Sequence, residues 1–493
     1  MLKQIGKNVV VLAIISLLLI SSFLLMVPRS TASPAMIARN IQAWKNSVDL
    51  GTPRLIDMTP DHKYVVAGDT AYERVCLLNE TGKKVWRFNL TDTPLVDPML
   101  YWVCISDDGN YIAFGGVHTV VVDSDTTWEG FVFFFDRTGH VWNKTDFASE
   151  VVTGAISGDG SRLAIGYGNR VEAYDNAGIF KWGYDADDKV SSVSISSDGG
   201  YVAFAYRGEI CLLYEGAFVW KKITAGSYDR ARVRISSDAK YVISVNDLMQ
   251  NVTYFNQTGS MLWSQTIEPY DFYDAAITPN GEYAVAVGNA TIYYFNRSGL
   301  IWSYNTGESK LNSIDISSDG YFIVASSWGW GKVFHLNKVK TLIWELDSWY
   351  AGQVAISANG EYFAYGDNDY NVYLYFSKKY FNYRFVTPDT EPISNLNVTW
   401  YFPNGTIYTS MLTNGTGWIQ FFDPYYLDYS TSAYYWQTMV GSYVLVNTNY
   451  YESVSSQVAS LFDWNIYIHD AGGLPISARV ETYLWNNTLY DNR

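Results

Sequence analysis

A short turn motif recurs eight times between residues 57 and 366, and it constrains the fold more than any other feature of the chain. The copies are DMTPDHKYVVAG, CISDDGNYIAFG, AISGDGSRLAIG, SISSDGGYVAFA, RISSDAKYVISV, AITPNGEYAVAV, DISSDGYFIVAS and AISANGEYFAYG. Their shared turn residues are Asp61, Asp108, Asp159, Asp198, Asp238, Asn280, Asp319 and Asn359, at intervals of 39 to 51 residues. A period near 40 residues with several strands in each unit predicts a β-propeller.

Each unit has the pattern of four strands, a to d. An apolar strand a is followed by an Asp-Gly or Asn-Gly hairpin turn, then by strands b and c, a second turn such as NETG, and a strand d that carries a Trp. These tryptophans are Trp86, Trp142, Trp182, Trp220, Trp263, Trp302 and Trp344. They follow only seven of the eight repeats, so we expect residues 41–47, with Trp44, to supply the outer strand of the eighth blade. The prediction is an all-β chain with an eight-bladed propeller at residues 41–377, and seven blades as the runner-up.

Composition narrows the class of partner. The chain has 493 residues, 17% of them aromatic, and a formal net charge of −15. The negative charge argues against nucleic acid and anionic membrane surfaces as partners. Three cysteines, Cys76, Cys104 and Cys211, are too few and too scattered for a disulfide framework, so we expect buried free thiols.

The repeats resemble two known families. The S-x-D-G turn resembles WD40 repeats, and the runs TGKKVW (Thr81–Trp86) and GLIW (Gly299–Trp302) are similar to the repeats of pyrroloquinoline-quinone (PQQ)-type propellers. The resemblance covers the predicted propeller and implies its fold. It implies little about activity, because propellers host many activities.

The N-terminal segment predicts export. Lys3 and Lys7 precede an apolar run at residues 9–27, and small residues follow it. Residues 1–35 are therefore expected to be a signal peptide, cleaved after Ala32 or Ala35, or an uncleaved transmembrane signal anchor. Either would place the rest of the chain outside the cytoplasm, in contact with the membrane only through this segment.

Potential N-glycosylation sites support an extracellular glycoprotein, in the style of archaeal cell-surface repeat proteins. The N-x-S/T motifs begin at Asn79, Asn89, Asn143, Asn251, Asn256, Asn289, Asn296, Asn397, Asn404, Asn414 and Asn486. The alternative is that a chain rich in Tyr, Asn and Thr contains such motifs by chance, and that those at the c–d turns are turn chemistry.

The repeat signature stops near residue 377. Residues 378–463 carry short alternating strands and Asn-Gly turns, which predict a small Ig-like β-sandwich. Its P-I-S entry, N-G-T-G-W turn and Y-V-L-V strand resemble the carboxypeptidase-regulatory (prealbumin-like) domain. Residues 464–493 look like the start of a second, incomplete copy, so we expect the chain to be a fragment of a longer protein; alternatively these residues add strands to the first sandwich.

The candidate site lies on the variable loops. In a propeller the b–c and d–a loops share one face, and here they differ from blade to blade, whereas the a–b and c–d turns are regular. Residues 117–130 are predicted to be one of these variable loops. The variable loops are rich in carboxylates and aromatics, which suit a carbohydrate, a cationic peptide or calcium. The candidate ligand-binding residues are Asp187, Asp229, Tyr270, Asp271, Trp328, Trp330, Asp347, Trp349 and Asp367. The alternative is that these loops are acidic only because the protein is acidic.

No motif indicates catalysis or a metal site. The five His residues form no ligand pair, and there is no G-x-S-x-G motif or phosphate-binding glycine loop. We expect no cofactor, with calcium left open. The first hypothesis is a non-catalytic extracellular scaffold that binds protein or glycan at the cell surface. The alternatives are a secreted enzyme acting on sugars or using a quinone, and an envelope assembly scaffold.

Overall fold

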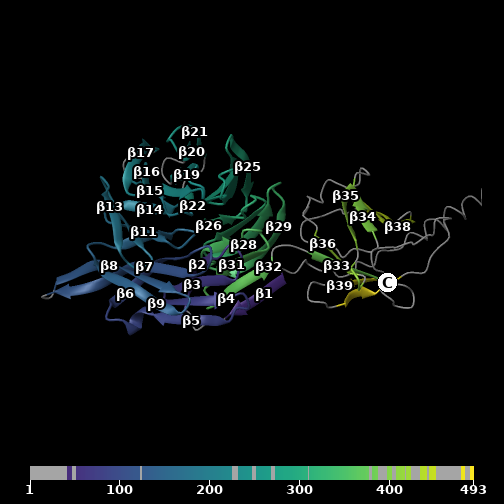
Figure 1. The fold of residues 1–493 in the computed structure, drawn as a ribbon, viewed down its shortest axis with the longest axis horizontal. Coiled ribbons are helices and arrows are strands. Elements are labelled where there is room, and N and C mark those ends of the chain that lie inside the picture. The colour runs from purple at the N-terminus through teal and green to yellow at the C-terminus, as the bar shows by residue number, and fades with distance from the viewer. Residues whose placement is uncertain are drawn as a thin grey trace, which may run out of the picture. The chain divides into compact units, whose positions relative to one another are not determined.

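The chain is all-β, and its repeats form an eight-bladed β-propeller (Figure 1). The computed structural model describes residues 41–46, 51–122, 125–224, 231–246, 251–267, 272–308, 310–376, 380–386, 397–401, 407–412, 414–416, 418–422, 434–440, 443–450, 479–483 and 489–492. Within these residues the single helical element is the 3-10 turn η1 (Leu90–Asp92). The predicted signal or anchor segment lies outside the described residues.

Each blade is a four-stranded antiparallel sheet in the order a, b, c, d. Blade 1 comprises β2 (Pro53–Met58), β3 (Tyr64–Asp69), β4 (Arg74–Asn79) and β5 (Lys84–Asn89), and blade 2 comprises β6 (Val96–Ile105), β7 (Tyr111–Val122), β8 (Asp125–Asp136) and β9 (Gly139–Phe147). Blade 3 comprises β10 (Val151–Ile156), β11 (Arg162–Tyr167), β12 (Arg170–Asp175) and β13 (Phe180–Asp185). Blade 4 comprises β14 (Val190–Ile195), β15 (Tyr201–Tyr206), β16 (Glu209–Tyr214) and β17 (Ala217–Ile223). Blade 5 comprises β18 (Ala231–Ile235), β19 (Tyr241–Asn246), β20 (Asn251–Asn256) and β21 (Met261–Thr266). Blade 6 comprises β22 (Phe272–Ile277), β23 (Tyr283–Gly288), β24 (Thr291–Asn296) and β25 (Gly299–Asn305). Blade 7 comprises β26 (Leu311–Ile316), β27 (Phe322–Ser327), β28 (Trp330–Asn337) and β29 (Leu342–Trp349).

The eighth blade joins the two ends of the repeat region. Its strands are β30 (Val354–Ile356), β31 (Tyr362–Gly366), β32 (Val372–Phe376) and, as strand d, the N-terminal β1 (Ile41–Asn46). β1 pairs antiparallel with β32, from Ile41 opposite Phe376 to Asn46 opposite Val372, and Figure 1 shows the purple strand beside the green one. The prediction of eight blades closed by residues 41–47 is confirmed, and the count of seven is wrong.

Every a–b turn is built by a buried hydroxyl. In blade 3 the Ser157 hydroxyl donates to Asp159 Oδ1 at 2.6 Å and accepts from the Arg162 backbone N–H at 3.0 Å. The same hydroxyl-to-Asp or hydroxyl-to-Asn bond occurs in all eight blades, with Thr59, Ser106, Ser157, Ser196, Ser236, Thr278, Ser317 and Ser357 as donors, and all eight are buried. The a–b turn is therefore longer than the two-residue hairpin turn expected from Asp-Gly, because the Ser or Thr that lies two residues before the Asp or Asn also forms hydrogen bonds within the turn.

Tryptophans of strand d join neighbouring blades. The ring of Trp44 in blade 8 lies against Gly82 in the c–d turn of blade 1, and its indole N–H donates to the Glu80 carbonyl at 3.0 Å. Trp220 lies in the same way against Gly259 of the next blade. Only glycine leaves room for the ring, since a Cβ on Gly82 would come within 2.6 Å of Trp44.

The innermost strands form a closed ring. Strand a of each blade contacts strand a of both neighbours, from β2 through β6 and β10 round to β30 and back to β2. Strand a is an edge of its own sheet, so some of its backbone N–H groups need partners outside that sheet. Side chains of the preceding blade supply them: the Val233 N–H donates to Ser192 Oγ at 3.2 Å, and the Ile56 N–H donates to Gln353 Oε1 at 3.1 Å.

Two predictions about local structure need correction. Residues 117–130 were expected to be a loop, but β7 and β8 continue through most of them as a long hairpin. Trp330, Asp347 and Trp349 were also expected in loops, but they lie in β28 and β29. In both cases extra strand residues continue the b–c or c–d pairing of the blade beyond the length of the other repeats.

The cysteines agree with expectation. Cys76, Cys104 and Cys211 are free and buried. Burial raises the pKa of the Cys76 and Cys211 thiols to about 12. These thiols are thus apolar core groups of strands c in blades 1 and 4.

Residues beyond the propeller form two four-stranded sheets. One contains β33 (Tyr380–Val386), β36 (Trp418–Phe422), β39 (Arg479–Tyr483) and β40 (Leu489–Asn492), in the order β36-β33-β39-β40. The other contains β34 (Asn397–Tyr401), β35 (Ile407–Leu412), β37 (Tyr434–Val440) and β38 (Tyr443–Tyr450), in the order β35-β34-β37-β38. β39 and β40 thus share a sheet with strands of the first predicted sandwich. The sandwich itself and the domain boundaries stay predictions.

The Trp–glycine contacts predict a difference between two glycine substitutions. Gly82→Ala and Gly307→Ala both place a side chain at positive φ, +74° and +78°, which costs about 1–2 kcal/mol in each case. Only Gly82 faces an indole ring, and overpacking there should cost a further ~1–3 kcal/mol. Calorimetric unfolding of the two variants measures the difference; equal destabilisation would contradict the proposed role of Trp44 packing.

The buried turn hydroxyls predict a stability loss on their removal. Ser157→Ala should lower the free energy of unfolding by about 1–3 kcal/mol, because the Arg162 N–H loses its acceptor inside the fold. Ser303→Ala, at an exposed position of β25, is the matched control and should change stability by less than about 0.5 kcal/mol. Denaturant unfolding followed by fluorescence compares them, and a Ser157→Ala variant as stable as the control would refute the argument.

Candidate functional site

Hydrogen bonds between the segments that connect the strands show that these segments lie on two faces of the propeller, as predicted. The Trp328 N–H in the b–c loop of blade 7 donates to the Lys310 carbonyl of the preceding d–a loop at 2.8 Å. The Lys338 N–H in a c–d turn donates to the Tyr321 carbonyl at the a–b turn at 2.7 Å. The b–c and d–a loops therefore share one face, which we call the variable face, and the regular turns share the other.

Aromatic side chains of blades 6 and 7 gather around a lysine on the variable face. The Lys310 ammonium lies 4.1 Å from the ring centre of Tyr273 and 5.4 Å from that of Trp328. Both contacts are cation–π interactions, which hold the rings and the ammonium in a fixed arrangement. Half of the Trp328 side-chain surface stays exposed (50%), so one aromatic plate remains open to a ligand.

The aromatic group continues towards blades 8 and 1. The Tyr350 N–H donates to the Gly329 carbonyl at 2.7 Å, which joins the loop after β29 to the one that carries Trp328. Arg54 of blade 1 lies 5.6 Å from the Tyr350 ring centre and donates to Asn368 Oδ1 at 3.2 Å. The Trp349 ring is 6.3 Å from that of Tyr350 and is 38% exposed. We call Tyr273, Trp328, Trp349 and Tyr350 the aromatic cluster.

The predicted site residues divide into four groups. Trp328 and Trp349 belong to the aromatic cluster, and Trp330 is paired with Trp349 through the backbone. Asp347 is exposed on the same hairpin, opposite Lys332. Asp187 is in the d–a loop between blades 3 and 4, and its carboxylate binds Lys221 Nζ of blade 4 at 3.0 Å. Three further members, Asp229, Tyr270 and Asp271, lie outside the described residues.

Asp367 is placed differently from expectation. Its side chain is buried, and Oδ1 accepts the backbone N–H groups of Asp369 at 2.9 Å and Asn371 at 3.3 Å. Burial raises the pKa of this carboxyl. Asp367 therefore shapes the b–c loop of blade 8 from within instead of facing a ligand.

The described part of the variable face does not gather carboxylates for a metal. No group of three or more His, Cys, Asp or Glu side chains in the described residues could hold a metal ion. Calcium prefers six to eight oxygen ligands. Among the described residues, the acidic side chains of the variable face are therefore too far apart to form a metal site. The grouped side chains of this face are its aromatic rings.

Three aspartates stand on the innermost strands. Asp57, Asp274 and Asp315 each accept a backbone N–H of the following blade, for example the Ile105 N–H at 3.0 Å on Asp57 and the Ile356 N–H at 2.8 Å on Asp315. Asp274 also binds the Arg234 guanidinium at 2.7 Å. These carboxylates join blades, as the Ser and Gln side chains of other blades do.

The surroundings of Asp57 and Asp315 disfavour the ionised form of their carboxyl groups. Desolvation raises the pKa of Asp57 to about 6 and that of Asp315 to about 7. The negative charges of Asp57 and Asp274 add to the shift of Asp315, whereas hydrogen bonds from backbone N–H groups oppose it. Because Asp57 also interacts with Arg234 of the blade opposite, these groups converge towards the propeller axis.

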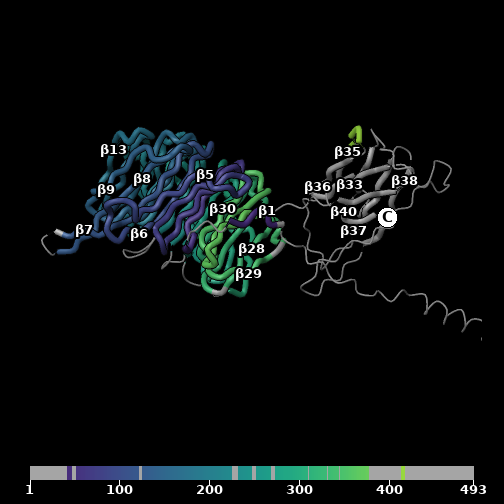
Figure 2. Tube along the Cα trace, turned by 90° about the horizontal axis from the view of Figure 1, so that it is seen from below, coloured from purple at the N-terminus to yellow at the C-terminus, as the bar shows by residue number. Residues whose placement is uncertain are grey.

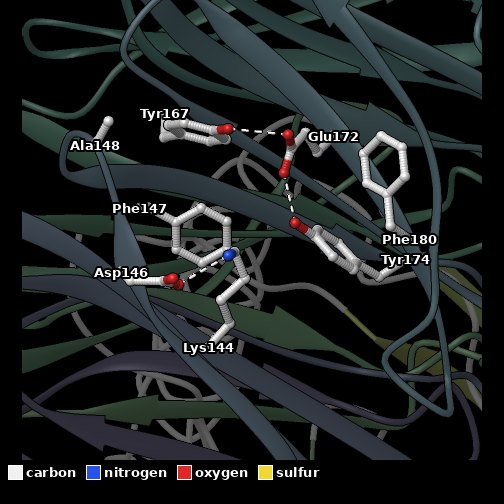
Figure 3. A pocket seen from close by; sticks show the side chains of 8 residues that line it. All are labelled: Lys144, Asp146, Phe147, Ala148, Tyr167, Glu172, Tyr174 and Phe180. Carbon is white, nitrogen blue, oxygen red and sulfur yellow. Dashed lines mark hydrogen bonds and ion pairs between the residues drawn. The ribbon is translucent and has the colours of Figure 1, made fainter.

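An outer pocket of about 420 Å³ lies between blades 2 and 3 (Figure 3). Its base is Glu172, which accepts hydrogen bonds from the hydroxyls of Tyr167 at 2.9 Å and Tyr174 and from Arg170 Nε at 2.7 Å. Lys144 pairs with Asp146 at its rim, at 2.8 Å. Burial and hydrogen bonding to Glu172 raise the pKa of Tyr167 to about 12. The polar groups of this pocket thus already satisfy one another.

Three of the potential glycosylation sites occupy equivalent turns. Asn79, Asn256 and Asn296 begin c–d turns, and in each the side-chain carbonyl accepts the backbone N–H two residues later, at 2.8 to 3.1 Å. Asp136 and Asp175 do the same in blades 2 and 3. Turn chemistry therefore accounts for these residues, and their glycosylation stays a prediction.

The sequence missed the residues that organise the aromatic cluster. Lys310 and Arg54 belong to no motif, and their partners are about 20 to 300 residues away in sequence. Asp57, Asp274 and Asp315 were missed as well, although a signal was present: an acidic residue lies within strand a of each of these three repeats.

No protein-family model matches the chain, and no curated protein matches it. The assignment of the fold rests on the pairing of its strands. No helix in the described residues is long and apolar enough to cross a membrane.

The raised pKa of Asp315 predicts a pH dependence of stability. The unfolded state loses this proton near pH 4 and the native state near pH 7, so the contribution of Asp315 to stability falls as pH rises between these values. The stability of the wild-type protein relative to Asp315→Asn should therefore fall from pH 4 to pH 7.5. Denaturant midpoints across this range measure it, with the exposed Asp347→Asn as control; a constant difference for Asp315→Asn would contradict the assignment.

Proposed function

We propose that the protein is a non-catalytic extracellular propeller that binds protein or glycan through its variable face. The observation that carries the proposal is the aromatic cluster, in which Trp328 and Trp349 stay exposed while cations and loop hydrogen bonds fix their surroundings. Flat aromatic plates beside polar groups suit the apolar faces of sugar rings and the side chains of a protein partner.

The rigidity of the scaffold supports a binding role. The ring of blades holds the loops in place, so little conformational entropy is lost when a ligand binds them. The predicted export signal, the potential glycosylation sites and the resemblance to WD40 and PQQ-type repeats support a cell-surface location, with an archaeal origin as part of the same proposal. The membrane would be contacted only through the N-terminal segment.

A second candidate, an envelope assembly scaffold, is favoured by one observation. The β7–β8 hairpin projects beyond the other blades (Figure 2). It carries the exposed apolar side chains of Val121 and Trp128. Exposed apolar patches of this kind are typical of surfaces that contact other proteins. The enzyme hypothesis has weaker support, because Asp57, Asp274 and Asp315 are engaged with backbone N–H groups.

The test is a binding screen with matched variants. The purified full chain is screened against an oligosaccharide array and against solubilised cell-envelope proteins. Trp328→Ala and Trp349→Ala should each weaken binding about tenfold or more, because truncating an exposed aromatic anchor removes its contact area.

Phe218→Ala is the control, since Phe218 is an equally exposed aromatic on strand d of blade 4. Equal binding by the Trp variants, the control and the wild-type protein would refute the aromatic cluster as the site. Turnover of a bound oligosaccharide would refute the non-catalytic part of the proposal.

A further inference from the structure

The b–c hairpin of blade 2 forms an arm that the other blades lack. β7 and β8 have 12 residues each, whereas strands b and c of the other blades have 5 to 8. Figures 1 and 2 both show β7 and β8 extending past the neighbouring blades. Strand β6 is also long and pairs with this extension, Val96 opposite Thr119. We call Val96–Leu100, Thr119–Val122 and Asp125–Glu129 the arm.

One face of the arm is apolar and exposed. Residues opposite each other in antiparallel strands share a face of the sheet, so Val96, Thr119 and Trp128 lie on the same face. Val121, two residues after Thr119, belongs to that face as well. Val96, Val121 and Trp128 are exposed by 49%, 61% and 53%.

These side chains contribute little to the core of the blade. The buried residues of blade 2, among them Phe114, Phe131 and Phe134, lie before and after the extension. A mostly exposed Trp and two exposed valines side by side bury little surface within the chain itself. Such a patch on a projecting element is typical of a surface that binds a partner.

The outer edge of the arm is open. β9 pairs with β8 only from Gly130, opposite Phe147, to Asp136, opposite Gly139. In the described part of the chain, no strand pairs with Asp125–Glu129 on the side away from β7. An open edge offers unpaired backbone N–H and C=O groups to an added strand. Lys and Pro, which commonly protect such edges, are absent from Asp125–Glu129.

The negative charge of the arm determines which kind of strand can add to its open edge. Asp97 and Asp125 are exposed and Glu129 is half-buried, while residues 117–130 contain neither Lys nor Arg. A second copy of the chain would bring carboxylates against carboxylates, which is unfavourable across paired strands. A strand with basic side chains pairs with these acidic groups instead.

We propose that the arm binds an extended polypeptide segment of alternating basic and apolar residues, which adds as a strand to the free edge of β8. Backbone hydrogen bonds to Asp125–Glu129 hold the segment, its apolar side chains cover Trp128 and Val121, and its basic side chains pair with Asp125. This inference rests on the proposed assembly function and names the class of partner that it requires.

The experiment uses the full chain and a labelled synthetic peptide of alternating Lys and Val, with binding followed by fluorescence anisotropy. Two peptides are compared with it: one of alternating Glu and Val, and one of the same Lys and Val sequence with every second backbone nitrogen methylated. Trp128→Ala and Asp125→Lys alter the arm, and Phe218→Ala is the control on an exposed aromatic elsewhere.

The expected result is saturable binding of the Lys-Val peptide and none of the Glu-Val peptide. N-methylation should weaken binding about tenfold or more, since it removes backbone donors from the added strand. Trp128→Ala and Asp125→Lys should each weaken binding about tenfold, because they remove an aromatic anchor and a charge pair. Phe218→Ala should have no effect.

Three outcomes would overturn the proposal. Undiminished binding of the N-methylated peptide would show attraction by charge without strand pairing. An equal loss in Phe218→Ala would place the peptide elsewhere. Concentration-dependent self-association in sedimentation velocity, abolished by Trp128→Ala, would make a second copy the occupant. Trp328→Ala should leave peptide binding unchanged, so a failure of the aromatic cluster is distinguishable from a failure of the arm.

Discussion

The structure depends on those backbone N–H groups of the innermost strands that have no partner within their own sheet. Strand a is the edge of every blade, and a buried edge is stable only if its donors are satisfied. The preceding blade provides the acceptors, from Ser192 and Gln353 to Asp57 and Asp315. Each blade is therefore completed by its neighbour, and β1 must return to blade 8 for the ring to close. The tryptophans of strand d reinforce the same contacts further out.

Using carboxylates for these bonds makes the ring sensitive to its charge state. A Ser hydroxyl accepts the N–H without a charge, whereas Asp57 and Asp315 accept it as acids whose ionisation is opposed by desolvation. Arg234 compensates one of the three charges by pairing with Asp274. The carboxylates near the axis therefore serve contacts between blades, whereas the exposed rings of Trp328 and Trp349 on the variable face are the basis of the proposed binding role.

Much of the fold was predictable because local chemistry repeats. A Ser or Thr two residues before Asp or Asn predicts the a–b turn in every blade, and the Trp of strand d predicts the contact with the next blade. The site was less predictable. Trp328 and Trp349 were predicted as site residues because both were assigned to variable loops, and both are exposed. The same reasoning also included Asp367, which is buried. It also treated residues 117–130 as a loop, since the pattern does not reveal how far a hairpin continues.

The sequence by itself predicted eight blades, with seven as the alternative, and it predicted the strand that closes the ring and the faces on which the loops lie, because each follows from a spacing or a turn within about 50 residues. Only the tertiary structure decided which loop residues meet. Lys310 reaches Tyr273 and Trp328, and Arg54 reaches Tyr350, across blades that are adjacent in space only once the ring has closed. It also decided that the edge of β8 stays open, because that depends on where β9 ends its pairing. Contacts between loops of different blades are set by the packing of the whole ring, and no local pattern of residues specifies them.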